Sequence, residues 1–152
     1  MNDCNAAVVV FFIDGSVLVI KRVENPHDPW SGQMALPGGK REDNESCEET
    51  AKREAFEEVG IRPNNLQFIG IYSPNNFPSL KVYAYLSCLK ERIDPKIDPK
   101  EVDKAFWIRL EELRNEGNAF YYGQYRIWGM TYRILRDFIN KKIYLECQSD
   151  ND

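Results

Sequence analysis

The sequence predicts an α/β protein in which a mixed β-sheet lies between helices, an α/β/α sandwich. Strand-like segments rich in β-branched and aromatic residues precede, separate and follow two amphipathic helices, which is the order expected of that architecture. The first strand-like segments are apolar on both faces, as strands covered on both sides are. The chain of 152 residues, 43% of them hydrophobic, fits one domain. We expect that domain to span residues 1–145 and a polar C-terminal tail to span residues 146–152.

The first two strands are predicted to form a hairpin. Residues 6–13 and 17–20 are apolar runs on either side of Asp14-Gly15, and an Asp-Gly pair favours the type I′ turn of a hairpin. Residues 22–33 then form a loop that contains two prolines. The chain must turn sharply at Pro37-Gly38-Gly39.

The first helix is predicted over residues 46–59. Ser46 and Glu49 have the spacing of a capping box, in which each side chain accepts a hydrogen bond from the backbone of the other residue. Gly60 is a natural stop for the helix, and Pro63 prevents its continuation.

The remaining elements follow from shorter patterns. Further strands are expected at residues 34–36, 66–72, 82–89 and 104–108, with a helical turn at 110–113. A second helix is expected over residues 125–141. Its apolar residues keep the spacing of a core-facing stripe: Ile127, Thr131, Ile134, Leu135 and Phe138.

The charge balance excludes one broad class of function. Lys and Arg number 20 and Asp and Glu number 24, so the formal net charge is −4. Proteins that bind polymeric nucleic acid neutralise phosphates with many cations, and this chain lacks such an excess. A nucleotide-sized ligand needs only a few local cations, so a small nucleotide-derived substrate remains open.

The histidine and cysteine contents argue against several kinds of catalytic and metal site. His27 is the only histidine and lies in a polar loop, which argues against a His-rich zinc site or a Ser-His-Asp triad. Cys4, Cys47, Cys88 and Cys147 form no C-x-x-C pair, so we expect four free thiols in a reducing compartment.

No membrane association is expected from the apolar segments. The apolar run at the N-terminus covers 8 residues, too few to cross a bilayer, and no basic segment precedes it. Together with the expected free thiols, this predicts a cytoplasmic protein.

Three carboxylates lie side by side on the first predicted helix. Glu54, Glu57 and Glu58 are three and four residues apart and fall within one arc of the helix, with Glu58 at the edge of the apolar stripe. Like charges at this spacing destabilise a helix, and the helix dipole disfavours anions in the last turn. A hard divalent cation such as Mg²⁺ would offset both effects, because it takes oxygen ligands. The alternative is a solvated Glu-rich face.

The surrounding residues favour the metal. The pattern G-x5-E-x7-R-E-x-x-E-E-x-G is formed by Gly39, Glu45, Arg53, Glu54, Glu57, Glu58 and Gly60. It resembles the Nudix box of the Nudix hydrolases, with Ala55 where the general pattern has a bulkier aliphatic residue. The resemblance implies a Nudix fold over residues 1 to about 145. It also implies hydrolysis of a nucleoside diphosphate linked to another moiety.

The resemblance also implies roles for the residues of the box. Glu57 and Glu58 should be the main ligands of Mg²⁺ or Mn²⁺, and Glu54 a further ligand or the general base. Arg53 should hold these glutamates in orientation through charge-assisted hydrogen bonds. The physical need is clear, because a diphosphate repels an attacking hydroxide until divalent ions neutralise its oxygens.

Other positions should support the box and the substrate. The Gly38 carbonyl is a candidate metal ligand, and Gly38 and Gly39 allow the backbone to approach the substrate closely. Glu45 and Gly60 should support the loop and the helix structurally. Glu42 is either a further member of the site or a loop charge.

Further residues outside the box complete the candidate site. Glu101 lies in a loop where many Nudix enzymes place a functional glutamate, so it is a second candidate for the general base. Arg22 is a candidate phosphate contact or a strand-end cation. Phe77 and the loop aromatics Tyr121 and Tyr122 are candidates for lining a pocket for adenine or a pantetheine arm.

Two segments, one leading into the box and one far downstream of it, narrow the range of candidate substrates. Residues 31–39 are similar to a motif of the coenzyme A pyrophosphatase branch, with Leu36 in place of Phe, and residues 127–131 resemble the I-W-G-x-T segment of that branch. The chain departs from the branch at Asp28, where an arginine is expected, and at residues 21–22, which lie one position out of register. The resemblance implies coenzyme A or an acyl-CoA as the substrate.

Several alternatives remain at this point. ADP-ribose, other nucleoside diphosphate derivatives and modified nucleoside triphosphates are alternative substrates, and the enzyme is expected to be a monomer or a homodimer. A catalytically inactive Nudix domain that binds a nucleotide would usually lack box glutamates, whereas Glu54, Glu57 and Glu58 are all present. An RNA-end activity is disfavoured by the acidic balance.

Overall fold

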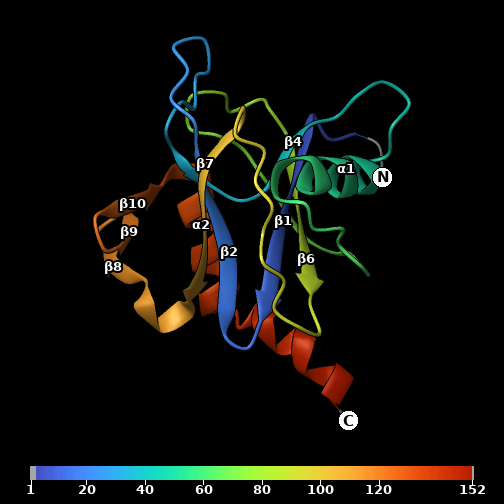
Figure 1. Cartoon of the computed structure of the whole chain (residues 1–152), viewed down its shortest axis with the longest axis vertical. Helices are drawn as coiled ribbons and strands as arrows, with labels where there is room; N and C mark the ends of the chain where they lie inside the picture. Colours follow the sequence, from blue (N-terminus) through green and yellow to red (C-terminus); the bar gives the residue numbers. More distant parts are fainter. Residues whose placement is uncertain (1–2, 152) are drawn as a thin grey trace.

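The frame of the molecule is a mixed β-sheet with one helix on each face (Figure 1). The structure is a computed structural model that describes residues 3–151. The strands of the main sheet are β1 (Ala6–Ile13), β2 (Ser16–Arg22), β3 (Met34–Ala35), β4 (Gly38–Lys40), β5 (Gln67–Tyr72), β6 (Val82–Cys88) and β7 (Val102–Arg109). The predicted α/β class and mixed sheet are confirmed.

The pairing of β1 makes the sheet mixed. β1 lies parallel to β6 and antiparallel to β2 and β4, and the sheet continues in the order β3-β2-β1-β6-β5, with β7 paired to β2. The β1–β2 hairpin forms at the predicted turn, where Asp14 and Gly15 both have positive φ angles, 47° and 78°.

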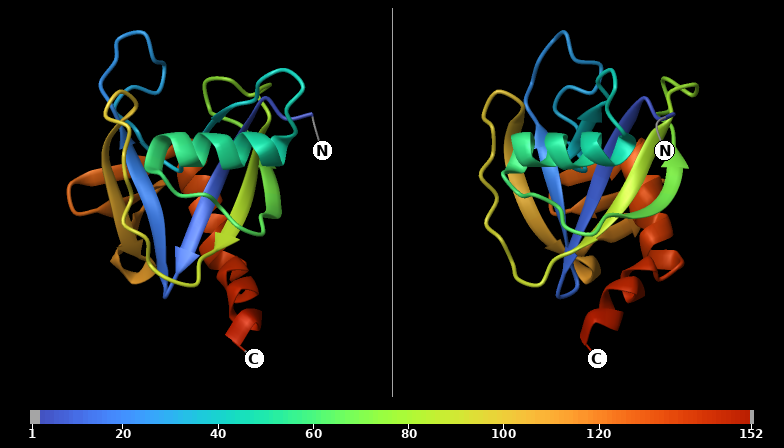
Figure 2. Two further views of the ribbon diagram at one scale, coloured as in Figure 1. Left: turned by 45° about the vertical axis from the view of Figure 1, so that its right-hand side comes forward. Right: turned by 90° about the vertical axis from the view of Figure 1, so that its right-hand side faces the viewer.

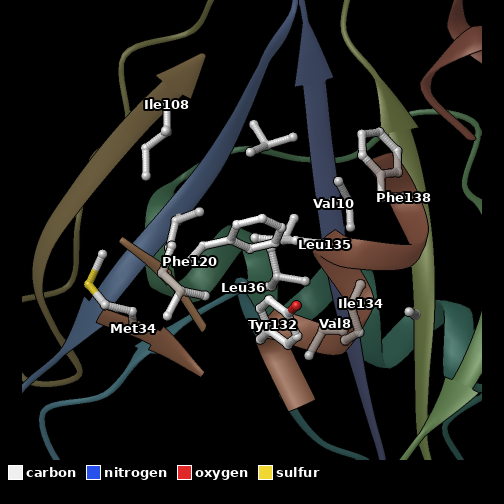
Figure 3. Close-up of a cluster of buried hydrophobic side chains, with 14 of the residues drawn as sticks. Val8, Val10, Met34, Leu36, Ile108, Phe120, Tyr132, Ile134, Leu135 and Phe138 are labelled. Atoms are coloured by element: carbon white, nitrogen blue, oxygen red, sulfur yellow. The ribbon is translucent and has the colours of Figure 1, made fainter. Parts of the chain in front are cut away.

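The alternation of side chains along β1 divides the core into two clusters. Ala7, Val9 and Phe11 face helix α1 (Cys47–Val59), whereas Val8, Val10 and Phe12 face helix α2 (Gly129–Asn140). All of β1 is therefore buried, as strands covered on both faces are. Figure 2 shows the two helices on opposite sides of the sheet, and Figure 3 shows the cluster beneath α2.

Helix α1 begins and ends where the local sequence predicts. The Ser46 and Glu49 side chains form the capping box, with the Glu49 amide donating to Ser46 Oγ at 3.1 Å and the Ser46 amide donating to Glu49 Oε1 at 2.8 Å. Gly60 ends the helix with a φ of 71°. The small buried residues Ala51 and Ala55 let α1 lie close to the sheet.

Strand β4 brings the Pro-Gly-Gly turn next to α1. It pairs with the start of β1, with Gly38 opposite Val8 and Gly39 opposite Ala7. A Cβ atom on Gly38 would lie 2.2 Å from the Ala7 carbonyl oxygen, so only glycine fits there. This close pairing fixes the backbone of the turn beside the glutamates of α1.

The prediction of a single helix over residues 125–141 is wrong at its start. Residues Tyr125–Trp128 form strand β10, which pairs with β9 (Ala119–Tyr122), and α2 begins only at Gly129. Together with β8 (Arg114–Glu116) they form a small second sheet. Pairing with β9 satisfies the backbone hydrogen-bonding groups of these residues. The helical spacing of Ile127 with the apolar residues that follow it had predicted a helix here instead. The predicted helical turn is the short helix η1 (Leu110–Glu112).

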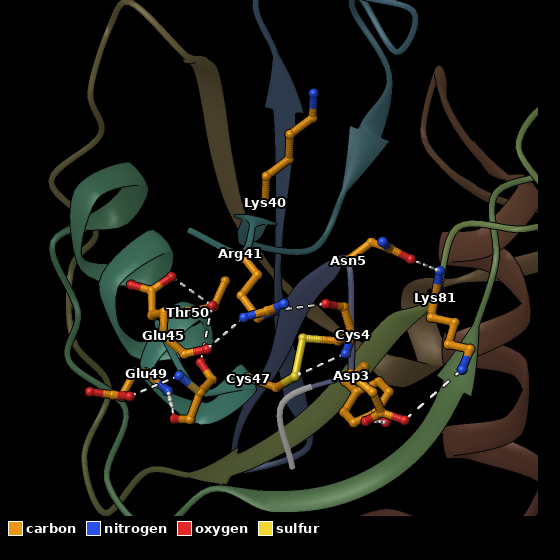
Figure 4. Close-up of a disulfide and its surroundings, with 12 residues drawn as sticks. Asp3, Cys4, Asn5, Lys40, Arg41, Glu45, Cys47, Glu49, Thr50 and Lys81 are labelled. Atoms are coloured by element: carbon orange, nitrogen blue, oxygen red, sulfur yellow. Dashed lines mark hydrogen bonds and ion pairs between the residues drawn. A yellow bond between two sulfur atoms is a disulfide. The ribbon is translucent and has the colours of Figure 1, made fainter. Parts of the chain in front are cut away.

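The expectation of four free thiols is wrong. Cys4 forms a disulfide with Cys47, and Cys88 forms a disulfide with Cys147 (Figure 4 shows the first). The paired residues are 43 and 59 positions apart, so no local spacing indicates them. Disulfides are rare in reducing compartments, and the predicted cytoplasmic location therefore loses the support that free thiols gave it.

The second disulfide also bears on the C-terminus. The helix η2 (Ile143–Asn151) crosses residue 145, and Cys147, within the predicted polar tail, is tied to the end of β6. The division of the chain at residue 145 stays a prediction. Among residues 3–151, no helix is both long enough and apolar enough to cross a membrane.

Candidate active site

Glu58 is the most deeply buried carboxylate of the candidate site. Its side chain is 5% exposed, and Glu58 Oε1 accepts a hydrogen bond from the Gly38 amide at 2.9 Å. Burial is the main cause that raises the pKa of Glu58 to about 8; the nearby Glu54 carboxylate contributes to the rise, and the hydrogen bond from the Gly38 amide opposes it. A carboxylate in this position carries a charge that the protein alone does not fully stabilise.

Glu54 lies against the second glycine of the turn. A Cβ atom on Gly39 would lie 2.4 Å from the Glu54 carboxylate, so the absence of a side chain at position 39 makes room for this group. Burial is the main cause that raises the pKa of Glu54, and a hydrogen bond from Arg53 opposes it. The turn and the helix therefore meet at two points, Gly38 with Glu58 and Gly39 with Glu54.

Arg53 joins the glutamates into one network. Arg53 Nη1 donates to Glu54 Oε1 and Glu57 Oε1, both at 2.9 Å. Arg53 Nε donates to Glu45 Oε2 at 2.6 Å, and Nη2 donates to the Lys40 carbonyl at 3.0 Å. The guanidinium group therefore holds the loop before α1 and two α1 carboxylates in one arrangement.

Glu45 anchors this network from the loop. It accepts hydrogen bonds from Arg53, from the Thr50 hydroxyl at 2.7 Å and from the Glu42 amide at 3.0 Å. The Arg53 hydrogen bond is the main cause that lowers the pKa of Glu45 to about 2. Glu42 also lies 3.4 Å from Arg53, although its side chain is largely exposed.

Arg22 approaches the site from the end of β2. Its Nη1 atom lies 4.0 Å from Glu58 Oε2. Its Nη2 and Nε atoms both donate to Asp28 Oδ2, at 2.8 and 3.0 Å. Asp28 therefore holds the guanidinium group beside the buried carboxylate.

Glu101 lies near the α1 glutamates, as its position in the sequence predicts. It is exposed in the loop before β7, and its carbonyl accepts a hydrogen bond from the Val23 amide at 3.1 Å. The charge of Glu101 contributes to raising the pKa of Glu54 and of Glu58, although burial contributes more. The fold thus gathers on one site carboxylates from two distant segments.

The aromatic candidates are divided by the fold. Phe77 lies in the loop between β5 and β6, is 46% exposed, and contacts the Trp30 ring. Tyr121 and Tyr122, expected in loops, lie in strand β9 instead. The Tyr122 ring packs on Phe106 against the core rather than standing in a loop.

The donor chemistry fits a hard divalent cation. Glu54, Glu57 and Glu58 present carboxylate oxygens on adjacent turns of α1, and oxygen is the ligand type that Mg²⁺ and Mn²⁺ take. The raised pKa values of Glu54 and Glu58 mean that their ionised forms lack sufficient compensation, which a cation would supply. Within residues 3–151, no set of three or more His, Cys, Asp or Glu groups is already drawn together around one point. In this arrangement Arg53 bridges Glu54 and Glu57.

Three contributors were missed from the sequence. Asp28 entered only as a departure from a motif, but it positions Arg22. Thr50 fits any polar helix position, but its hydroxyl donates to Glu45. The Lys40 carbonyl carries no side-chain signal at all, although it accepts from Arg53.

Similar proteins agree with the fold and the motif. Nudix hydrolase 15, mitochondrial, from Arabidopsis thaliana is 30% identical over 161 residues, covering 86% of this chain and 55% of the plant protein. The uncharacterized Nudix hydrolase NudL from Escherichia coli (strain K12) is 28% identical over 125 residues, covering 70% of this chain and 65% of the bacterial protein. The chain thus spans less than two thirds of the length of these relatives.

A solved structure supports the fold. The NUDIX domain of NrtR from Shewanella oneidensis, crystallised with ADP ribose, has a TM-score of 0.69 and 17% sequence identity, covering 93% of this chain and 89% of that chain. At this identity the likeness concerns the fold alone. A family profile described as the NUDIX domain matches residues 4–126, most of the chain and all of the glutamate-bearing helix. The chain therefore belongs to the NUDIX domain family.

Proposed function

We propose that the protein is a Mg²⁺- or Mn²⁺-dependent pyrophosphohydrolase that cleaves the diphosphate of a nucleoside diphosphate derivative. One observation carries this proposal. Glu54, Glu57 and Glu58 lie together on α1, Arg53 contacts two of them, and the Gly38 backbone contacts the third. The packing of the helix does not require such a cluster of carboxylates, whereas the binding of divalent ions does.

The residues that would hold the ions are the α1 glutamates, with Glu57 and Glu58 as main ligands. Glu54 and the Gly38 carbonyl are further candidates. Bound divalent ions would neutralise the diphosphate oxygens and lower the pKa of an attacking water. Arg53 would keep Glu54 and Glu57 in place while these charges change.

A carboxylate of the chain then accepts the proton of the water. Glu54 is one candidate, because its raised pKa makes it a better proton acceptor than an ordinary carboxylate. Glu101 is the other, because it is exposed and close enough to affect both Glu54 and Glu58. The variants Glu54→Gln and Glu101→Gln distinguish them, since loss of the base removes the acidic limb of the pH–rate profile.

Arg22 and the two glycines are proposed to contact the substrate. Asp28 holds the Arg22 guanidinium beside Glu58, from which it can reach a phosphate oxygen. Gly38 and Gly39 carry no side chain, so a diphosphate can approach the backbone closely. Gly60 and Glu45 support the helix and its loop from either end.

We propose coenzyme A or an acyl-CoA as the substrate, cut to 3′,5′-ADP and 4′-phosphopantetheine or its acyl form. The support is the resemblance of residues 31–39 and 127–131 to the coenzyme A pyrophosphatase branch. In the structure the second of these segments spans the end of β10 and the start of α2. Water adds to one phosphorus atom and the bridging oxygen leaves with the other.

ADP-ribose is the second candidate substrate. The NrtR NUDIX domain, which has a similar fold, was crystallised with ADP ribose, so a domain of this architecture can bind that compound. Asp28 weakens the case for coenzyme A, because an aspartate stands where the coenzyme A branch has an arginine. Other nucleoside diphosphate derivatives and modified nucleoside triphosphates remain in the same class.

The test is a panel of these compounds with Mg²⁺ or Mn²⁺, with products resolved by ion-exchange chromatography. We expect coenzyme A to have the highest kcat/KM and to yield 3′,5′-ADP. Faster cleavage of ADP-ribose would contradict the coenzyme A assignment but keep the reaction class. Absence of cleavage across the panel, by a protein whose fold is verified by circular dichroism, would contradict the proposed function.

A further inference from the structure

Two aromatic side chains from separate loops contact each other, and one of them lies two residues after Asp28. Trp30 lies in the loop between β2 and β3, and Phe77 lies in the loop between β5 and β6. Their ring centroids are 5.8 Å apart and their planes form an angle of 59°. Trp30 Nε1 also donates to Asn76 Oδ1 at 3.3 Å. The two loops therefore present one joint aromatic surface.

This surface is not part of the hydrophobic core. Neither ring belongs to the two buried clusters that flank the main sheet. Phe77 is 46% exposed and Trp30 is partly exposed, so apolar ring faces remain in contact with water. Aromatic rings that a fold positions but does not bury are available to bind a ligand.

The Trp30 backbone is connected to the carboxylate cluster through hydrogen bonds to Asp28 and an ion pair of Arg22. The Trp30 amide donates to Asp28 Oδ1 at 2.9 Å. The other oxygen of Asp28 holds Arg22, whose Nη1 atom lies 4.0 Å from Glu58. Asp28 therefore fixes at the same time a cation next to the reaction centre and the backbone of the aromatic residue.

One oxygen of Asp28 thus holds a cation suited to phosphate, and the other holds the backbone of a residue whose ring is suited to a planar base. A nucleoside diphosphate carries both partners in one molecule. Stacking of a base on an aromatic side chain needs no base-specific hydrogen bond, because every base has a π-face. The aromatic surface therefore fits the nucleobase of a substrate whose diphosphate lies at Arg22 and α1.

We propose that Trp30 and Phe77 bind the nucleobase of the substrate by stacking, with Asp28 as the positioning residue between base and diphosphate subsites. This inference rests on the proposed function, which places the diphosphate at α1. It adds Trp30, which the sequence did not single out, and it assigns the aromatic face to the base rather than to the non-nucleotide arm.

The first test is steady-state kinetics of Trp30→Ala and Phe77→Ala on the best substrate of the panel. Loss of one base-stacking contact corresponds to roughly five- to 150-fold in affinity, so we expect KM to rise about tenfold with kcat within twofold of wild type. Trp30→Phe keeps a stacking ring and should restore most of the affinity. Phe68→Ala, which removes an aromatic ring of β5 that is 38% exposed, is the matched control and should leave KM unchanged.

A substrate without a base separates binding from a merely structural tie between the loops. The same diphosphate diester with hydrogen in place of the base should be cleaved with unchanged kinetics by Trp30→Ala. An equal rise of KM on both substrates, or no rise on the base-bearing one, would overturn the proposal.

A binding measurement keeps this inference distinct from the proposed function. In the Trp107→Phe, Trp128→Phe variant, Trp30 is the single remaining tryptophan. AMP should quench its fluorescence, whereas ribose 5-phosphate should not. Quenching by AMP in a protein that cleaves no diphosphate would support the base site and contradict the proposed hydrolase function. Absence of quenching would overturn the proposal of a base site at Trp30.

Discussion

Glu58 Oε1 accepts a hydrogen bond from the Gly38 amide at 2.9 Å, although Glu58 stands on helix α1 and Gly38 on strand β4. This bond joins the glycine turn to the helix at the most deeply buried carboxylate of the site. Because burial raises the pKa of Glu58 to about 8, the ionised group reduces the stability of the protein when no cation is bound.

Replacement of Glu58 should therefore separate stability from activity. Glu58→Gln keeps an acceptor for the Gly38 amide but removes the charge, so we expect higher stability without divalent ions and at least an approximately hundredfold loss of kcat/KM, about 2.7 kcal/mol. The pKa of Glu58 is higher in the folded than in the unfolded protein, so the stability of the wild type should fall as the pH rises from about 4.5 to 8. Thermal unfolding in EDTA across this range checks the prediction.

Glu48→Gln, on the exposed first turn of the same helix, is the matched control. It should leave activity, and the pH dependence between 4.5 and 8, unchanged. If Glu58→Gln and the wild type showed the same pH dependence, the buried charge assigned to Glu58 would be incorrect.

Arg53 should affect both catalysis and stability. Arg53→Lys keeps one positive charge but cannot donate to Glu45, Glu54 and Glu57 together, so we expect kcat to fall roughly 10- to 100-fold. Loss of the charged hydrogen bonds should lower the free energy of unfolding by about 1–3 kcal/mol. Steady-state kinetics and urea unfolding measure the two effects.

Replacement of Arg53 by alanine should change the stability of the protein at acid pH in a defined range. Arg53 is the main cause that lowers the pKa of Glu45 to about 2, so this pair stabilises the protein above about pH 4.5 and the effect is lost as pH falls through 2. Arg53→Ala should reduce the dependence of unfolding on pH in this range. An unchanged acid titration would show that Glu45 does not depend on Arg53.

The two glycines of the turn should respond differently to alanine. At Gly39 the new Cβ atom meets the Glu54 carboxylate at 2.4 Å, and a side chain can move away, so Gly39→Ala should lower activity more than stability. At Gly38 it meets the Ala7 carbonyl of the adjacent strand at 2.2 Å, so Gly38→Ala should mainly lower stability. Melting temperatures and kcat/KM of the two variants check this prediction. A larger loss of stability in Gly39→Ala than in Gly38→Ala would contradict it.

The disulfides should contribute measurably to stability. Each bridge closes a long loop, and the loss of a bridge of this kind typically costs about 2–4 kcal/mol. We expect Cys4→Ala, Cys47→Ala to lower the melting temperature by several degrees, and dithiothreitol to destabilise the wild type but not a variant lacking all four cysteines.

Thiol titration provides the direct check of the pairing. The unreduced wild type, unfolded in guanidinium, should show no free thiol, and the Cys4→Ala, Cys47→Ala variant should also show none because Cys88 and Cys147 remain paired. Four titrating thiols in the wild type would restore the original expectation.

The parts of the fold that the sequence predicts are those with local signals. The Asp14-Gly15 turn and the capping box at Ser46 depend on neighbouring residues, and both form as predicted. Strand β10 depends on pairing with β9, so the helical spacing that begins at Ile127 misplaced the helix start. The disulfides depend on three-dimensional proximity across more than 40 residues, which no spacing rule supplies.

The candidate site divides along the same line. The helix wheel places Glu58 at the edge of the buried stripe, and the structure confirms its burial. The pairing of Arg22 with Asp28 and the contact of Trp30 with Phe77 arise from loops whose course has no periodic signal. In the proposed function these loops contact the substrate, which is why the sequence predicts the reaction class more sharply than the substrate.

The most direct test of the central claim is hydrolysis of the best panel substrate in ¹⁸O-labelled water by wild type and by Glu57→Gln. The Glu57 side chain is half exposed, so this variant should fold normally. The wild type with Mg²⁺ should place one ¹⁸O atom in a single monophosphate product, and both EDTA and Glu57→Gln should abolish turnover. Equal turnover by Glu57→Gln, or products without ¹⁸O, would contradict a divalent-ion-dependent diphosphate hydrolase built on the glutamates of α1.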